Sequence, residues 1–161
     1  WRRGLVKPDL STTMSCPGYR PKQSDLVLTG VAETHFSRTS LDVRSVAQVL
    51  QAPAMVASHR RRSSSLQLPA ANADAGLKAN QSLVSFRTLA FPHLARCTAA
   101  YRALVAVEAA GQRLLVAADI VLVGRGRTEL TLSLTAPAAA RTAIAAAEVR
   151  LARLLLARVR A

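Results

Sequence analysis

The most regular pattern in the sequence is an alternation of apolar and polar residues in its second half. Over residues 128–135, leucines occupy every second position after the first, and polar or charged residues stand between them. Similar alternation runs through residues 96–108 and 114–124, and glycine-containing turns separate the three segments. Because successive side chains of a strand point to opposite faces, this pattern predicts three consecutive antiparallel strands with one solvated face.

The first half of the chain carries weaker strand patterns. Residues 26–36 predict a strand with a bulge at Gly30, and residues 43–50 predict a second strand that pairs with it as a hairpin. Residues 83–91 predict a further short strand, which Pro92 ends. Together with the alternating segments, these strands predict one antiparallel sheet.

Two prolines mark the starts of the predicted helices. Pro53 suits the first turn of a helix that extends to about residue 61, and Pro137 opens a helix that extends to about residue 160. The second helix has one apolar stripe, formed by Ile144, Leu151, Leu155 and Val159. Its opposite side carries Arg150, Arg153 and Arg160. The order β-β-α-β-β-β-β-α predicts an α+β fold, a two- or three-layer sandwich in which helices cover the antiparallel sheet.

The length of 161 residues suits a single domain. Residues 1–25 contain three prolines and no hydrophobic period, so we interpret them as an irregular N-terminal arm before a domain at 26–161. Residues 58–82 begin with three arginines and three serines and continue with Ala, Asn and Gly. This basic, Ala-rich insert is interpreted as a poorly ordered loop or helix, or as the product of a shifted reading frame.

The formal net charge of +13 raises the question of an anionic partner. The excess is spread over the arm, the insert, the strands and the last helix, and most of the basic residues are arginines, as GC-rich coding would produce. Residues 60–62 and 124–127 are the strongest candidates for phosphate contacts, but such runs are more often solvated loops. Aromatic residues make up only 4% of the chain, and no nucleic-acid-binding module is recognisable. We therefore expect nucleic acid less than other partners.

The chain carries no recognisable catalytic or metal-binding motif. The GxSxG, P-loop and HExxH patterns are missing, and the histidines stand apart at His35, His59 and His93. Asp119 and Glu129 lie on neighbouring predicted strands. If they share a face they form a carboxylate pair, but we favour separate salt bridges, for which Arg113 and Arg127 are available. The prediction is a protein that is not an enzyme and that holds no metal or cofactor.

The only cysteines are Cys16 and Cys97. Cys97 suits a small buried hydrophobic position and Cys16 an exposed one, and the alternative is a disulfide that ties the arm to the domain in an oxidising compartment. No apolar stretch reaches the roughly 18 residues that a membrane-spanning helix needs. No signal-peptide pattern is visible in residues 1–25, so we expect any such peptide to have been removed.

Residues 16–36 and 83–161 resemble the PsbP-like extracytoplasmic domains of actinobacterial lipoproteins and sensor-type proteins. The resemblance rests on turn and strand motifs, namely Cys16-Pro17-Gly18-Tyr19, Ser24-Asp25-Leu26, Tyr101-Arg102 and Gly126-Arg127-Thr128-Glu129. It implies a secreted or surface-attached, non-enzymatic domain with a groove between sheet and helix. Such a groove would bind a small ligand, a component of the cell envelope or a partner protein.

The functional prediction is a non-catalytic extracytoplasmic module of the binding or sensor type. Its candidate binding residues are Tyr101, Arg102, Arg127 and Glu129. Because strand alternation places Tyr101 and Arg102 on opposite faces, all four residues cannot line one pocket. The alternative prediction is a basic cytoplasmic protein that associates with nucleic acid through its dispersed arginines.

Overall fold

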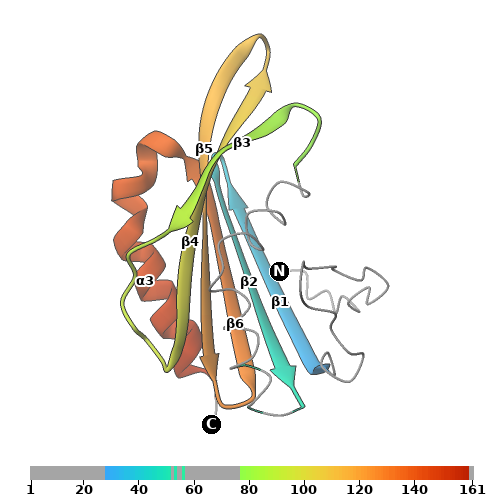
Figure 1. The fold of residues 1–161 in the computed structure, drawn as a ribbon, viewed down its shortest axis with the longest axis vertical. Helices are drawn as coiled ribbons and strands as arrows, with labels where there is room; N and C mark the ends of the chain where they lie inside the picture. Colours follow the sequence, from blue (N-terminus) through green and yellow to red (C-terminus); the bar gives the residue numbers. More distant parts are fainter. Residues whose placement is uncertain (1–27, 52, 54–55, 57–76, 160–161) are drawn as a thin grey trace.

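The computed structural model describes residues 28–51, 53, 56 and 77–159. In this part of the chain a six-stranded antiparallel sheet is followed by a C-terminal helix, so the fold is of the α+β class (Figure 1). The elements are β1 (Leu28–Arg38), β2 (Leu41–Leu50), β3 (Gln81–Thr88), β4 (Cys97–Ala109), β5 (Gln112–Arg125), β6 (Thr128–Pro137), the short 3₁₀ helix η2 (Ala138–Ala140) and α3 (Arg141–Ala157). The strand order across the sheet is β1-β2-β6-β5-β4-β3.

The pairing confirms the predicted meander and the predicted hairpin. β4 pairs with β5 and β5 with β6, while β1 pairs with β2, and every pair is antiparallel. The β1–β2 register shifts between Leu28 and Gly30, where the bulge was predicted. In the two-residue β4–β5 turn, Ala110 and Gly111 have φ angles of 49° and 73°. Positive φ at both central residues matches the right-handed twist of the strands that such a turn joins.

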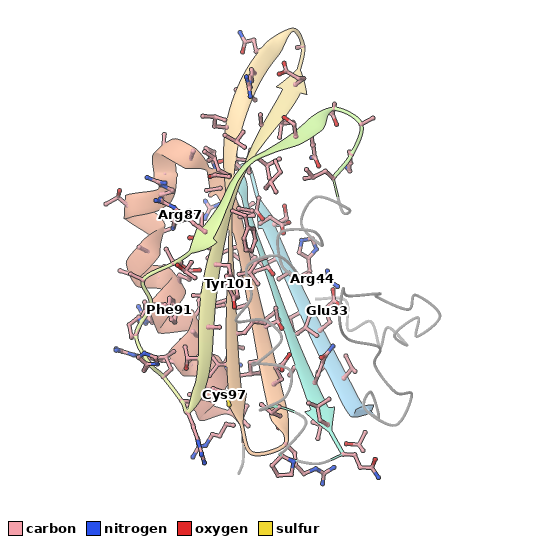
Figure 2. The ribbon with its side chains drawn as sticks, in the orientation of Figure 1. Glu33, Arg44, Arg87, Phe91, Cys97 and Tyr101 are labelled. Carbon is pink, nitrogen blue, oxygen red and sulfur yellow. The ribbon has the colours of Figure 1, made fainter. Side chains whose placement is uncertain are left out.

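The predicted strand at residues 83–91 differs from β3 at both ends. β3 starts two residues earlier and ends at Thr88. Leu89 donates its backbone N–H to the carbonyl of Ala100 at 2.8 Å, and the chain then leaves the sheet edge. Leu89 and Phe91 pack against the core, so burial of these two side chains outweighs continuation of the strand. Phe91 lies on the side of α3 (Figure 2).

One face of the sheet, here called the helix face, packs against α3. Its core lies where the central strands cross under the helix and consists of Ala100, Val121, Val123, Leu130, Leu132 and Ala152. The predicted alternation in β6 is confirmed, because its three leucines are buried on this face. Of the stripe predicted for the last helix, Leu151, Leu155 and Val159 pack against the core. The helix α3 begins at Arg141, after the η2 turn, rather than at Pro137, and it ends at Ala157, before Val159.

The opposite face of the sheet, here called the far face, is not simply solvated. Along β4, Tyr101, Ala103 and Val105 are all buried on this side. The ring of Phe86 on β3 stacks on that of Tyr101, with the centroids 5.6 Å apart. The prediction of one solvated face is therefore wrong for β4, because its apolar far-face residues are buried while Ala100, Arg102 and Ala106 of the other set lie under the helix.

Several predictions fall wholly or partly outside the described residues. The arm at 1–25 lies outside them, as does most of the insert at 58–82, although Gln81 and Ser82 belong to β3. Of the helix predicted at 53–61, Pro53 and Val56 are described and both are helical. Val56 is buried on the far face against Gly124, where a Cβ would stand only 2.2 Å from the Val56 Cγ1 atom.

Candidate functional site

The structure separates the four residues predicted to bind a ligand. Tyr101 and Arg102 are consecutive residues of β4, so their side chains face opposite sides of the sheet. In the ladder with β5, Tyr101 pairs with Ile120 and Arg102 pairs with Asp119. Tyr101 lies on the far face and is 3% exposed, with its ring against Phe86. These contacts make Tyr101 a packed side chain rather than one that is open to a ligand.

Arg127, in the turn between β5 and β6, hydrogen-bonds to the end of β2 and to the start of β1. Its Nε donates to the backbone carbonyl of Leu50 at 2.9 Å, and its Nη2 donates to the Oγ1 of Thr29 at 3.2 Å. The backbone N–H of Leu50 donates in turn to the carbonyl of Arg127 at 2.8 Å. The β5–β6 turn is thereby tied to the end of β2 and the start of β1, so the guanidinium satisfies backbone and hydroxyl groups of the fold.

Glu129 lies on the far face, where its neighbour across the ladder is Gly124 on β5. It is buried beside Cys97 and Val56, and these residues line a small apolar cavity of about 10 Å³. A space of that size holds at most about one water molecule. Cys97 is half-buried and is a free thiol, while its predicted partner Cys16 lies outside the described residues, so the disulfide stays a prediction.

Arg102 belongs to a buried charged cluster on the helix face. Both its Nε and its Nη2 donate to the two carboxylate oxygens of Asp119, directly across the β4–β5 ladder. Asp119 is 2% exposed and the Arg102 side chain only slightly more. The bidentate hydrogen bonds with the carboxylate raise the pKa of the Arg102 guanidinium above its usual value.

Glu148 of α3 is the third charged residue of this cluster. It is 2% exposed, and its Oε1 has no hydrogen-bond partner in the structure. Burial and, to a smaller extent, the charge of Asp119 raise the pKa of the Glu148 carboxyl to about 7, although the charge of Arg102 partly opposes them. We call Arg102, Asp119 and Glu148 the buried triad. At neutral pH it holds one strong ion pair and one carboxyl close to its titration point.

The predicted relation between Asp119 and Glu129 is resolved by the register. Asp119 is on the helix face and Glu129 on the far face, so the two carboxylates do not form a pair. The favoured alternative, a salt bridge, is confirmed for Asp119, but its partner is Arg102 rather than Arg113 or Arg127. Arg102 is directly opposite Asp119 in the ladder, whereas Arg113 lies near the hairpin tip.

Glu148 is the residue that sequence reasoning missed. It falls at i+4 from Ile144 and i−3 from Leu151, inside the apolar stripe of the last helix. A carboxylate within such a stripe is itself a signal, because an uncompensated charge at a core position is costly. That signal predicts a buried acid but does not identify the groups facing it, which only the strand register defines.

The described residues contain no group of three or more His, Cys, Asp or Glu side chains able to hold a metal ion. Within the same residues, no helix has the length and apolar character needed to cross a membrane. Two side-chain contacts join β1 to β2. His35 contacts Asp42 at 2.5 Å, and Arg44 donates two hydrogen bonds to the carboxylate of Glu33. Glu33 and Arg44 lie close together in Figure 2.

The large exposed apolar side chains are distributed unevenly. Leu114 and Leu115 are consecutive residues of β5 and are 51% and 45% exposed. Both lie close to the tip of the β4–β5 hairpin, which extends beyond the end of the sheet (Figure 1). The other exposed examples stand singly, as Phe36 on β1, Val84 on β3 and Leu154 on α3.

Comparison with known proteins assigns no family. No family model matches the chain, and no curated protein matches it. Among solved structures, the chain is similar to PA94 from Pseudomonas aeruginosa, a protein of unknown function. The two share 16% sequence identity, the match covers 77% of this chain and 80% of that one, and the TM-score is 0.37. A likeness of this size carries no argument about function.

Proposed function

We propose that this protein is a non-catalytic extracytoplasmic module that binds a cell-envelope component or a partner protein across its surface. The observation that carries the proposal is the exposure of two consecutive leucines, Leu114 and Leu115, on a projecting hairpin. The buried charged groups Arg102 and Asp119, by contrast, contact each other beneath α3. A solvent-exposed apolar pair at a projecting tip is a feature of contact surfaces.

The arrangement of the charged residues supports binding rather than chemistry. Arg102 and Asp119 hold each other, and Arg127 is committed to the sheet ends. The buried triad lies beneath α3, where its three side chains are at most 11% exposed, so a substrate cannot reach it without separation of helix and sheet. The cavity at Glu129 and Cys97 is too small for a metabolite.

The proposal includes a finer description of the fold. We propose that a helix around Pro53 and Val56 covers the far face as α3 covers the helix face, in the order β-β-α-β-β-β-β-α. Val56 supports this arrangement, because it is helical and buried against Gly124 on the far face. The domain would then be a three-layer sandwich whose outward-facing parts are the strand edges and the hairpins.

Cell fractionation tests the proposed location. Cells that make the protein natively are treated with a membrane-impermeant thiol reagent and then separated into cytosolic and extracytoplasmic fractions, with a cytosolic enzyme as the control. We expect recovery outside the cytosol, with Cys97 either labelled or held in a disulfide. Recovery in the cytosol alone, with both cysteines as free thiols, would overturn the proposal.

A further inference from the structure

The β4–β5 hairpin projects beyond its neighbours in the sheet. β6 accompanies β5 only as far as Val116, which is opposite Pro137, so the residues of β5 nearer the turn have no strand on that side. On the other side, β3 accompanies β4 as far as Val107. At Leu114 and Leu115 only β3, β4 and β5 run side by side, and β5 is there the edge strand, so the exposure of the two leucines follows from the earlier end of β6.

The two leucines point to opposite sides of the tip. Leu114 is opposite Val107 on the far face, and Leu115 is opposite Ala106 on the helix face. A flat protein surface can cover one side of this projecting part of the sheet but not both sides at once. A medium that surrounds the inserted tip, as the interfacial layer of a bilayer does, covers both leucines together.

The rest of the tip suits entry into such a layer. The turn between the strands consists of Ala110 and Gly111, which are small and uncharged. Between this turn and the leucines, Glu108 and Arg113 are opposite each other across the ladder, with 3.9 Å between Oε1 and Nε, so this pair enters the layer ahead of the leucines with its charges offset. The outermost part of the hairpin thus carries no net charge.

Two basic residues lie near the base of the hairpin. Lys78 is exposed in the turn before β3, and Asn80 of that turn hydrogen-bonds to the backbone of Glu108. Arg141 begins α3, four residues after Pro137, at the same end of the sheet (Figure 1). With a net charge of +13 on the whole chain, this distribution favours an anionic surface over a neutral one.

We propose that the tip of the β4–β5 hairpin inserts Leu114 and Leu115 into the interfacial layer of an anionic lipid bilayer. Lys78 and Arg141 attract the lipid phosphates from the base of the hairpin, and the domain stays outside the hydrocarbon core. This inference rests on the proposed binding function and names the partner as a lipid surface. It concerns peripheral attachment and not a membrane-spanning segment.

Vesicle sedimentation tests the insertion. The full chain is mixed at physiological ionic strength with vesicles of phosphatidylcholine alone or of phosphatidylcholine with one quarter phosphatidylglycerol. We expect partition onto the anionic vesicles to fall at least about tenfold in the variant Leu114→Ser/Leu115→Ser, because two half-exposed leucines lose their apolar contact. Leu154→Ser is the matched control, since Leu154 is 49% exposed on α3, and its partition should change less than about twofold.

Two further variants separate insertion from adsorption. Lys78→Gln should weaken binding to anionic vesicles about fivefold and leave binding to neutral vesicles unchanged. Leu114→Trp, compared with the unchanged chain, should add fluorescence that brominated acyl chains quench. The single leucine variants keep the test informative if the double variant does not fold.

Several results would overturn the inference. One is the absence of binding to anionic vesicles, and another is binding that the leucine substitutions leave intact. A third is self-association of the chain that the double variant abolishes while vesicles remain unbound, which would assign the tip to a second copy. Any of these leaves the location experiment unaffected, so failure of lipid binding and failure of the proposed function are distinguishable.

Discussion

The buried carboxyl of Glu148 gives the sharpest prediction. Its pKa is about 7 in the folded protein against 4.5 for an ordinary glutamate, because the folded state buries the group beside the charge of Asp119. Folding therefore favours the protonated form. The stabilisation that this proton supplies is complete below pH 4.5 and is lost as the pH rises through 7.

The size of the effect follows from the two pKa values. Loss of the proton from Glu148 should cost about 3 kcal/mol of folding free energy between pH 4.5 and pH 8. The charges that face Glu148 are Asp119 and Arg102, and Arg87 is opposite Arg102 on β3 of the same face. The variant Glu148→Gln keeps the shape of the protonated acid and cannot ionise.

Urea denaturation followed by circular dichroism measures this prediction from pH 4.5 to pH 8.5. We expect the two proteins to have similar stability at the acid end and Glu148→Gln to be more stable at the alkaline end, by up to about 3 kcal/mol. Groups common to both proteins cancel in the difference. A stability difference that does not change with pH would refute the reasoning.

Glu33→Gln is the matched control, because Glu33 has the opposite sign of perturbation. Its hydrogen bonds with Arg44 hold the pKa of the Glu33 carboxyl below the ordinary value. Its contribution to stability is therefore present above pH 4.5 and is lost as the pH falls through the folded-state value. Above pH 7 Glu33→Gln should therefore be less stable than the unchanged protein and Glu148→Gln more stable, so the two differences have opposite signs.

Three other predictions concern packing and charge. Asp119→Ala should lower stability by about 3–5 kcal/mol in urea denaturation, because it leaves Arg102 buried without its partner; a loss below about 1 kcal/mol would contradict this. Gly124→Ala should destabilise the fold by about 1–3 kcal/mol, since its new methyl group overlaps Val56. Addition of Val56→Ala should restore part of that loss, whereas Gly30→Ala, whose nearest contact would be 3.8 Å away, should lack any comparable clash. Binding to duplex DNA in a filter assay should collapse between about 50 and 200 mM salt, and persistence would favour the nucleic-acid alternative.

The buried triad also bears on how α3 is attached. The helix covers the sheet mainly through aliphatic side chains, and Glu148 is the charged group buried among them. Because burial and the charge of Asp119 disfavour ionisation of Glu148, the contact between helix and sheet is weaker when Glu148 is ionised. A leucine at position 148 would join the apolar stripe of the helix, so this acid is not explained by packing alone.

Local sequence patterns were sufficient for most of the strands. Alternation of leucine with polar residues in β6 predicts its buried face, because the two-residue period of a strand is a property of the chain itself. Short glycine-containing turns predict the β4–β5 and β5–β6 hairpins for the same reason, since neighbouring strands joined by tight turns pair with each other. In β4 this reasoning is weaker, because the set of alternate residues that contains Arg102 is largely buried as well.

The tertiary structure alone decided which distant groups meet. The pairing of β2 with β6 brings Leu50 to Arg127, 77 residues away along the chain, and so commits a predicted binding residue to the scaffold. The partner of Asp119 and the burial of Glu148 depend likewise on register and helix placement. Periodicity records which side of its own element a residue occupies, whereas contacts between elements arise from packing that no local pattern encodes.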